Sequence, residues 1–219
     1  MRTKIIYEDN HILIVHKPAG LATQTSHVGQ PDVVSEIKNY LKSPYLGVVH
    51  RLDQPVEGLL VFAKAKEAAA KLTKQLSSGT LNKQYYAVIC GKPKEDFAEL
   101  VDYLIKDGNV GRIGSESEKE AKQAILQYKV LRSLSEDCSL IDVRIETGRF
   151  HQIRLQMAHA GHPILGDLKY GTQECIEMSW KYQVKNVALY AYRIQLYHPI
   201  TGKKLDFAIE PVFPVGGEV

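Results

Sequence analysis

Apolar and polar residues alternate in several parts of the chain, and this alternation predicts short strands. Residues 5–7 and 12–15 are β-type runs joined by Glu8-Asp9-Asn10, which is a hairpin signal. In residues 140–146, Ile141, Val143 and Ile145 point one way while the charged residues between them point the other. Such a pattern suits an antiparallel sheet with one solvated face. Further strands are predicted at residues 59–63, 85–90 and 124–131.

Three segments instead have the spacing of helices. Asp32 is placed to cap a helix whose apolar positions Val33, Val34, Ile37 and Leu41 share one face. Residues 66–76 form a second helix, with Ala69, Leu72 and Leu76 inward. From residue 150 a third helix carries Ile153, Met157 and Ala160 on one side, and Gly161-His162-Pro163 ends it.

Two segments fit neither period. Residues 107–120 are rich in Gly, Ser and Glu and indicate a loop between lobes, whereas residues 172–185 form an irregular polar segment that holds the single tryptophan, Trp180. The predicted fold class is α+β, with a mostly antiparallel mixed sheet and flanking helices and loops. We expect a single domain over residues 1–219, in which two closely fused lobes would hinge near 107–120.

Composition narrows the class of protein. The chain has 219 residues, 44% hydrophobic and 24% charged, which is ordinary for a globular protein. No apolar run is long enough for a membrane span, and the first residues do not form a signal peptide. Cys90, Cys138 and Cys175 are odd in number and widely spaced, which argues against a disulfide framework and a cysteine zinc site and favours the cytoplasm. The net charge of +3 permits a nucleic-acid partner without requiring one.

Several motifs occur in a specific order. His50-Arg51-Leu52-Asp53 precedes the apolar run at 59–63, and Lys83-Gln84-Tyr85-Tyr86-Ala87 follows. Downstream come Thr147-Gly148-Arg149-Phe150-His151-Gln152-Ile153-Arg154, Gly161-His162-Pro163-Ile164-Leu165-Gly166-Asp167 and His198-Pro199-Ile200-Thr201-Gly202. With Lys17-Pro18-Ala19-Gly20 near the start, the chain resembles the RluA-like family of RNA pseudouridine synthases from about Ile5 to Pro211.

The resemblance implies the pseudouridine synthase fold with a central RNA-binding cleft, and a reaction that isomerises uridine in RNA without a cofactor. Asp53 corresponds to the family's catalytic carboxylate, Tyr85 to its active-site tyrosine and Arg154 to its active-site arginine. A nearby cation would keep such a carboxylate ionised, and Arg51 is the alternative to Arg154 for that pairing. A tyrosine can stack on an extruded uracil and assist proton removal at C5.

Other residues are expected to bind the RNA. Arg51 and Leu52 flank the carboxylate, and Arg149 is expected to meet a phosphate. His151 falls on the same helical side as Arg154, three residues away, and Leu189 is either a residue that packs on the base or an ordinary core leucine. No carboxylate accompanies the histidines at ligand spacing, so no metal site is expected.

One departure bears on the substrate. The family commonly has Thr-Ser-Gly where this chain has Val56-Glu57-Gly58, so Glu57 adds a negative charge that would raise the pKa of Asp53 or repel one class of RNA. Because the first motif begins near Ile5, we expect no separate amino-terminal RNA-binding domain. A monomer acting on a flipped uridine in a stem-loop of ribosomal RNA or tRNA, and not on DNA, is the expected arrangement.

Two other functions remain open from sequence. The chain would be an RNA-binding or RNA-remodelling module whose catalysis has lapsed, for which Glu57 is the only support. Alternatively it would hydrolyse glycosidic bonds with Asp53 and Glu57 as a carboxylate pair, although Pro55 makes a regular helical spacing of the two doubtful.

Overall fold

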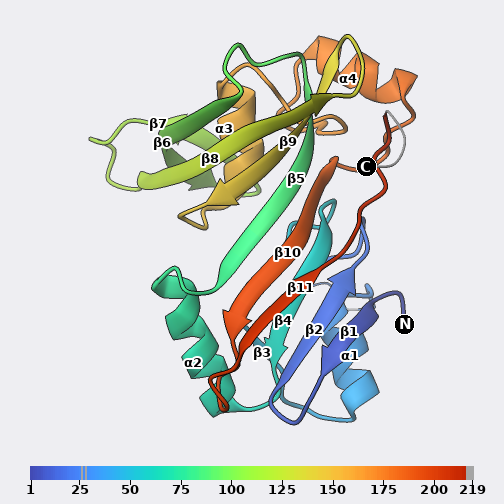
Figure 1. The fold of residues 1–219 in the computed structure, drawn as a ribbon, viewed down its shortest axis with the longest axis vertical. Helices are drawn as coiled ribbons and strands as arrows, with labels where there is room; N and C mark the ends of the chain where they lie inside the picture. The colour runs from blue at the N-terminus through green and yellow to red at the C-terminus, as the bar shows by residue number, and fades with distance from the viewer. Residues whose placement is uncertain (26, 28, 216–219) are drawn as a thin grey trace. The chain divides into compact units, whose positions relative to one another are not determined.

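The computed structural model describes residues 1–25, 27 and 29–215, and Figure 1 shows its secondary structure. The chain divides into two compact units. Unit 1 comprises Met1–Lys83 and Ala191–Glu210, and unit 2 comprises Gln84–Tyr190 and the segment from Pro211.

Unit 1 contains mixed, mostly antiparallel strands and two helices. The order of its strands is β1 (Lys4–Glu8), β2 (Ile12–Lys17), β4 (Glu57–Ala63) and the part of β10 (Leu189–Tyr197) that starts at Ala191. β11 (Lys204–Ala208) pairs with β10, and the short β3 (Gly47–Val48) pairs with β4. The helices are α1 (Val33–Leu41) and α2 (Lys66–Ser77). The hairpin of β1 and β2 and the Asp32 cap of α1, both predicted from sequence, are confirmed.

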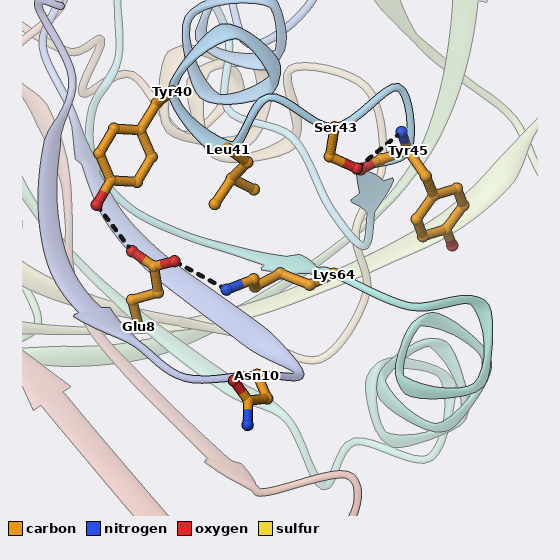
Figure 2. Close-up of a pocket in the computed structure, with 7 residues that line it drawn as sticks. All are labelled: Glu8, Asn10, Tyr40, Leu41, Ser43, Tyr45 and Lys64. Carbon is orange, nitrogen blue, oxygen red and sulfur yellow. Dashed lines mark hydrogen bonds and ion pairs between the residues drawn. The ribbon is translucent and has the colours of Figure 1, made fainter.

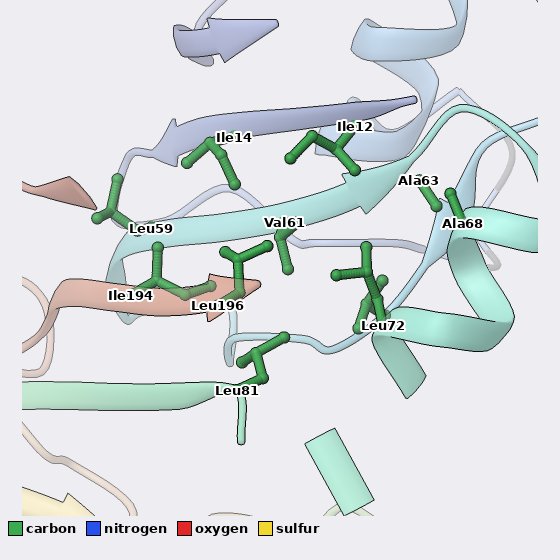
Figure 3. Packing of buried hydrophobic residues seen from close by; sticks show 11 residues of the cluster. Ile12, Ile14, Leu59, Val61, Ala63, Ala68, Leu72, Leu81, Ile194 and Leu196 are labelled. Atoms are coloured by element: carbon green, nitrogen blue, oxygen red, sulfur yellow. The ribbon is translucent and has the colours of Figure 1, made fainter. Parts of the chain in front are cut away.

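The core of unit 1 lies between α2 and the sheet (Figure 3). β4 is buried almost throughout, because apolar side chains from its neighbours and from α2 cover it. Ala68 and Leu72 of α2 are fully buried, while Ala69 and Leu76 are only partly buried. The buried face of the helix therefore differs slightly from the predicted face, which included Ala69 and Leu76. The clustered side chains are Ile12, Ile14, Val49, Leu59, Val61, Ala63, Ala68, Leu72, Leu81, Ile194 and Leu196.

Unit 2 contains antiparallel strands in the order β5, β9, β8, β6, β7. These strands span Asn82–Cys90, Cys138–Ile145, Lys122–Ser133, Phe97–Asp107 and Val110–Gly114, and the first two residues of β5 belong to unit 1. Helix α3 (Gln152–His159) packs on β6 and β7, and α4 (Gln173–Lys181) follows it in the chain. The α+β class predicted from sequence is therefore confirmed, with mostly antiparallel pairing and with β10 running in the same direction as β4 in unit 1 (Figure 3).

Two predicted irregular segments are wrong. Residues 107–120 are not a hinge, because they include β7 and lie inside unit 2, whereas the chain passes between the units after Lys83, Tyr190 and Glu210. Residues 172–185 contain the helix α4, which Thr172 caps by accepting a hydrogen bond from the Cys175 N–H. The helical signal of α4 is weak because its buried positions are a cysteine and a serine, Cys175 and Ser179.

The prediction against a disulfide is also wrong. Cys90 at the end of β5 is bonded to Cys175 in α4, and the Cα atoms are 5.9 Å apart. The two residues are 85 positions apart in sequence, so their spacing carried no sign of the tertiary contact. Cys138 is buried and reduced. Because a disulfide is present, the cysteines no longer favour a location in a reducing compartment.

Within the described residues, no helix has both the length and the apolar character needed to span a membrane.

Candidate functional site

Asp53 lies in unit 1, in the loop that leads into β4, as the sequence predicted. The residue before it is anchored on both sides of its peptide. The hydroxyl of Thr23 donates to the Leu52 carbonyl at 2.8 Å and accepts from the Leu52 N–H at 3.2 Å. Thr23 and Leu52 are both buried, so water does not compete for these bonds. The backbone at Leu52 is therefore fixed immediately before the carboxylate.

The residue after Asp53 is anchored as well. The Gln54 carbonyl accepts hydrogen bonds from the Gly20 N–H at 2.9 Å and from the ammonium group of Lys17 at 3.1 Å. Lys17 also donates to the carbonyls of Pro18 and Leu21. Its side chain is fully buried, and three carbonyl acceptors compensate for much of the hydration that it loses. The Lys17-Pro18-Ala19-Gly20 turn thus holds the Asp53 loop in place, a role that could not be predicted from the sequence.

Burial lowers the pKa of Lys17 to about 8, while the charges of Asp53 and Glu57 oppose that shift. Lys17 therefore brings a positive charge into the electrostatic environment of the Asp53 loop. His50, at the start of the same loop, is buried, and its Nε2 accepts from the Val61 N–H at 3.3 Å. Burial holds the pKa of His50 well below its usual range, with a smaller contribution from Lys83. His50 is accordingly a neutral anchor to β4.

Glu57 has a partner in unit 1. Its Oε1 lies 2.8 Å from Nε2 of His16, which is on the neighbouring strand β2. The next residue, Gly58, has φ of 139°, and a Cβ there would meet the Ala191 backbone nitrogen at 2.6 Å. A glycine is therefore required at the start of β4. This turn therefore keeps its glycine although Glu57 stands where the family commonly has serine.

In unit 2, Arg154 is buried in α3 and forms a bidentate ion pair with Asp167. Its Nε lies 2.7 Å from Oδ2 and its Nη2 2.8 Å from Oδ1, with side-chain exposures of 4% for Arg154 and 1% for Asp167. This side-on geometry points the Nη1 end of the guanidinium away from Asp167. Asp167 in turn accepts backbone N–H groups of Lys169 and Tyr170 on Oδ1. Asp167 is the last residue of the Gly161–Asp167 motif, and the sequence alone predicted no role for it.

His151 and Arg154, predicted to lie on one side of the helix, both contact Tyr170. Nδ1 of His151 is 2.6 Å from the Tyr170 hydroxyl, and the Arg154 guanidinium carbon is 5.1 Å from the centre of the Tyr170 ring. His151 precedes α3 in a left-handed conformation with φ of 53°, and its ring stacks on Phe150 at 3.8 Å. The structure thus brings these two predicted residues together through a third that sequence reasoning missed.

Helix α3 is held against the sheet by two glutamines. Gln156 is fully buried and donates to the carbonyls of Leu100 and Ala124. Gln152 donates to the Ile125 carbonyl and accepts from the Thr147 hydroxyl and the Arg149 N–H. These bonds explain why α3 is buried nearly all round and why Arg154 does not face solvent.

The remaining predicted residues lie in different surroundings. Arg51 and Arg149 are exposed, and Nε of Arg149 donates to the Gln123 carbonyl at 2.8 Å. Tyr85 is 5% exposed on β5 opposite Val143, whereas Tyr86 faces the other way and packs edge-on against Phe213. This confirms the predicted alternation of the two tyrosines. Leu189 is buried at the start of β10.

A hollow of about 490 Å³ in unit 1 is lined by residues outside the Asp53 loop (Figure 2). Glu8 and Lys64 form an ion pair at 2.8 Å in it, and the Tyr40 hydroxyl donates to Glu8 at 3.1 Å. The charged groups of the hollow are thus already paired with each other. Its lining residues are Glu8, Asn10, Tyr40, Leu41, Ser43, Tyr45 and Lys64. Among the residues that the structure describes, no cluster of three or more histidines, cysteines or carboxylates is arranged to hold a metal ion.

Comparison with known proteins identifies the class. The family described as RNA pseudouridylate synthase matches residues 11–159. The chain is 33% identical to the ribosomal large subunit pseudouridine synthase D of Zymomonas mobilis, covering 94% of this chain and 68% of that protein. It is 37% identical to the ribosomal large subunit pseudouridine synthase C of Rickettsia bellii, covering 92% and 66%. The chain thus spans about two thirds of the length of these relatives.

A solved structure supports the same fold. The human RNA pseudouridylate synthase domain-containing protein 1 matches with a TM-score of 0.79 at 20% identity, over 99% of this chain and 90% of that one. The chain belongs to the RNA pseudouridylate synthase family, and within it to the RluA-like group that the motifs indicated. It is an isomerase that converts uridine in RNA to pseudouridine.

Proposed function

We propose that this enzyme modifies uridines of large-subunit ribosomal RNA, with Asp53 as its catalytic carboxylate. The proposal of substrate rests on the names of the relatives from Zymomonas mobilis and Rickettsia bellii. The observation that carries the catalytic proposal is the bracing of the Asp53 loop, with buried hydrogen bonds on both sides of the residue. A reacting group must be held to within a fraction of an ångström, and such bonds supply that precision.

The reaction breaks the bond from N1 of uracil to C1′ of the ribose and forms a bond from C5 to the same carbon. The hydrogen on C5 leaves as a proton, and N1 gains one, so the isomerisation needs no electron donor or acceptor. We assign Asp53 to the group that attacks or deprotonates the nucleoside, and Tyr85 to stacking on the uracil and assisting loss of the C5 proton. Arg154 is proposed to keep the Asp53 carboxylate ionised, and its own guanidinium is held in place by Asp167.

RNA recognition is proposed to use the catalytic domain's own surface. Arg51 and Arg149 are exposed cations that suit phosphate oxygens, and Leu52, His151 and Leu189 are assigned to positioning the nucleotide. The protein is proposed to act as a monomer with a single catalytic domain. It would bind a flipped uridine in a short structured RNA element. The cytoplasm, where ribosomes are assembled, is the proposed location.

The substrate is tested with RNA labelled with tritium at uridine C5. Large-subunit ribosomal RNA and tRNA would be prepared separately from cells that lack this protein, because RNA from normal cells already carries the modification. We expect release of tritium to water from the ribosomal RNA and none above background from tRNA. Release from tRNA alone would overturn the choice of substrate. No release from either RNA, with binding retained, would favour the lapsed binding module.

A further inference from the structure

The three cysteines of the chain lie together in unit 2. Cys90 in β5 and Cys138 in β9 are directly opposite each other in the antiparallel register, so their side chains lie on the same face of the sheet. Cys175 in α4 is bonded to Cys90, and the sulfur of Met178, one helical turn later, lies 3.2 Å from that of Cys138. Helix α4 therefore covers both cysteines of the sheet.

The register also sets the distance between Cys90 and Cys138. The next pair along the two strands is the hydrogen-bonded kind, because the Gly91 N–H donates to the Asp137 carbonyl at 2.7 Å. Cys90 and Cys138 are consequently a non-hydrogen-bonded pair, in which the Cα atoms are about 4.5 Å apart. The Cys90 N–H accordingly donates elsewhere, to the Pro163 carbonyl. A disulfide spans such a separation, so Cys138 is within bonding reach of Cys90.

We infer that these cysteines form a thiol–disulfide switch, in which Cys138 takes the place of Cys175 as the partner of Cys90. The Cys138 thiolate attacks Sγ of Cys90, so that the Cys90–Cys138 bond forms as the Cys90–Cys175 bond breaks. Cys175 leaves as a thiolate and takes up a proton, which balances the proton that Cys138 lost. Since one disulfide replaces another, the exchange consumes no oxidant or reductant.

The exchange changes what holds α4 in place. While Cys90 is bonded to Cys175, the helix is tied covalently to β5. After the exchange that tie is absent, and the new bond joins β5 to β9, which already pair with each other. The helix is then held only by the chain and by non-covalent contacts, so its amide groups should open to solvent more often.

Loosening of α4 reaches the turn that supports Arg154. The Gly166 N–H donates to the buried Ser179 hydroxyl of α4 at 2.8 Å. The next residue, Asp167, forms the bidentate pair with Arg154. The form in which α4 is tied to β5 is thus the one that holds Arg154 more firmly. Control of catalysis by the switch rests on the proposed role of Arg154, whereas the exchange of bonds does not.

The rate of exchange depends on pH through the Cys138 thiol. Burial raises its pKa and the neighbouring Asp137 charge adds to the rise. A hydrogen bond with Ser135 and the Lys181 charge of α4 act in the opposite direction. Because only the thiolate attacks, the exchange should quicken about tenfold for each pH unit below that pKa. The switch is therefore slow at neutral pH and faster in alkaline solution.

The bonds are followed by blocking free thiols with N-ethylmaleimide in mildly acidic denaturant, before peptide mass spectrometry. Wild-type protein that carries its disulfide is kept without small thiols or oxygen at about pH 7 and about pH 9. We expect the Cys90–Cys138 bond to appear with Cys175 blocked, about a hundredfold faster at the higher pH. Cys138→Ala should keep Cys90–Cys175 throughout. Absence of the Cys90–Cys138 bond, or a bond from Cys138 to Cys175 in its place, would overturn the switch.

Two variants hold the switch in one position each, and each is compared with its own reduced form. Mild oxidation should give Cys90–Cys175 in Cys138→Ala and Cys90–Cys138 in Cys175→Ala. Reduction should then speed hydrogen exchange of residues 173–181 by at least about threefold in Cys138→Ala and leave it unchanged in Cys175→Ala. Failure of Cys175→Ala to form its bond, or equal responses of the two variants, would also overturn the switch.

Tritium release from labelled ribosomal RNA reports the effect on catalysis. Reduction should lower kcat of Cys138→Ala by at least about fivefold, because Arg154 loses support, and should leave kcat of Cys175→Ala unchanged. An unchanged kcat in Cys138→Ala would overturn control of catalysis by the switch. If the wild type releases no tritium, the proposed function fails, and the bond map and hydrogen exchange still decide whether the switch exists.

Discussion

The residues proposed to act in catalysis are held in place by hydrogen bonds and ion pairs to neighbouring buried side chains. Arg154 depends on Asp167, and the backbone around Asp53 depends on Lys17 and Thr23. The supporting residues are all buried, which strengthens each bond and makes an unpaired partner costly. Substitutions at these supporting positions therefore combine a structural cost with a loss of precision at the site.

The buried pair gives a quantitative prediction. Asp167→Asn leaves the Arg154 charge buried without its carboxylate, so the free energy of unfolding should fall by about 3 kcal/mol. The matched control is Asp206→Asn, which breaks an exposed bidentate pair with Arg193 and should cost less than about 1 kcal/mol. Urea denaturation measures both variants. Equal losses for the two would show that burial of the Arg154 pair does not matter.

The sequence could identify Asp53, Tyr85 and Arg154 only through their motifs. It could not assign Asp167, Tyr170 or Lys17, because a contact between residues far apart in the chain leaves no local pattern. Glu57 is a similar case. The sequence predicted that its charge would act on Asp53, but it could not predict the ion pair with His16, which lies on another strand. Residue types at a motif indicate chemistry, and the fold decides which side chains support it.

At the level of the element, hydrogen bonds to side chains fix the turns that join strands. The Asp9 carboxylate accepts from the backbone N–H groups of His11 and Ile12 at 2.7 and 2.9 Å, which closes the β1–β2 hairpin. It also accepts from the Tyr7 hydroxyl and contacts His198 at 2.9 Å. Burial would raise the pKa of Asp9, but these hydrogen bonds outweigh it and hold the pKa at about 2.

This shift predicts how stability depends on pH. Because the folded pKa of Asp9 lies below its usual 3.8, the unfolded chain binds more protons between about pH 4 and pH 2. The stabilisation is present above about pH 4 and is lost as the pH falls toward 2, and it amounts to about 2 kcal/mol. The difference in unfolding free energy between wild type and Asp9→Asn should shrink between about pH 6 and pH 3. The exposed Asp137→Asn serves as the control, and a difference independent of pH would contradict the prediction.

The link between β5 and α4 gives another element-scale prediction. The Cys90–Cys175 disulfide links residues 85 positions apart, and its loss should cost about 4.5 kcal/mol. Adding reductant should lower the urea midpoint of the wild type toward that of Cys90→Ser, and should leave the midpoint of Cys90→Ser unchanged. A wild type whose three thiols all react under non-reducing denaturation would contradict the presence of the bond.

The elements themselves were mostly predictable. Strict alternation identified β9, and the capping aspartate identified the start of α1. α4 escaped because Cys175 and Ser179, its buried positions, give little apolar contrast. β7 escaped because it is short and lies among glycines and charged residues that resemble a loop. Local pattern fails where tertiary packing, rather than hydrophobicity, selects the structure.

At the scale of the whole molecule, the motifs are distributed over two compact units. Unit 1 holds the braced Asp53 loop, and unit 2 holds Tyr85, His151 and Arg154. The net charge of +3 is small for a protein that binds RNA, so the attraction to phosphate must be local. The motifs in the sequence indicate the family, and the family match over residues 11–159 confirms it.

The measurement that tests the central claim most directly compares wild type with Asp53→Asn on ribosomal RNA labelled with tritium at uridine C5. Each isomerisation must expel the C5 hydrogen, so tritium in water counts the reaction itself. We expect release by the wild type, release from Asp53→Asn reduced by at least about a thousandfold, and RNA affinity of the variant within about twofold of the wild type. Undiminished release by Asp53→Asn would contradict the assignment of the catalytic carboxylate.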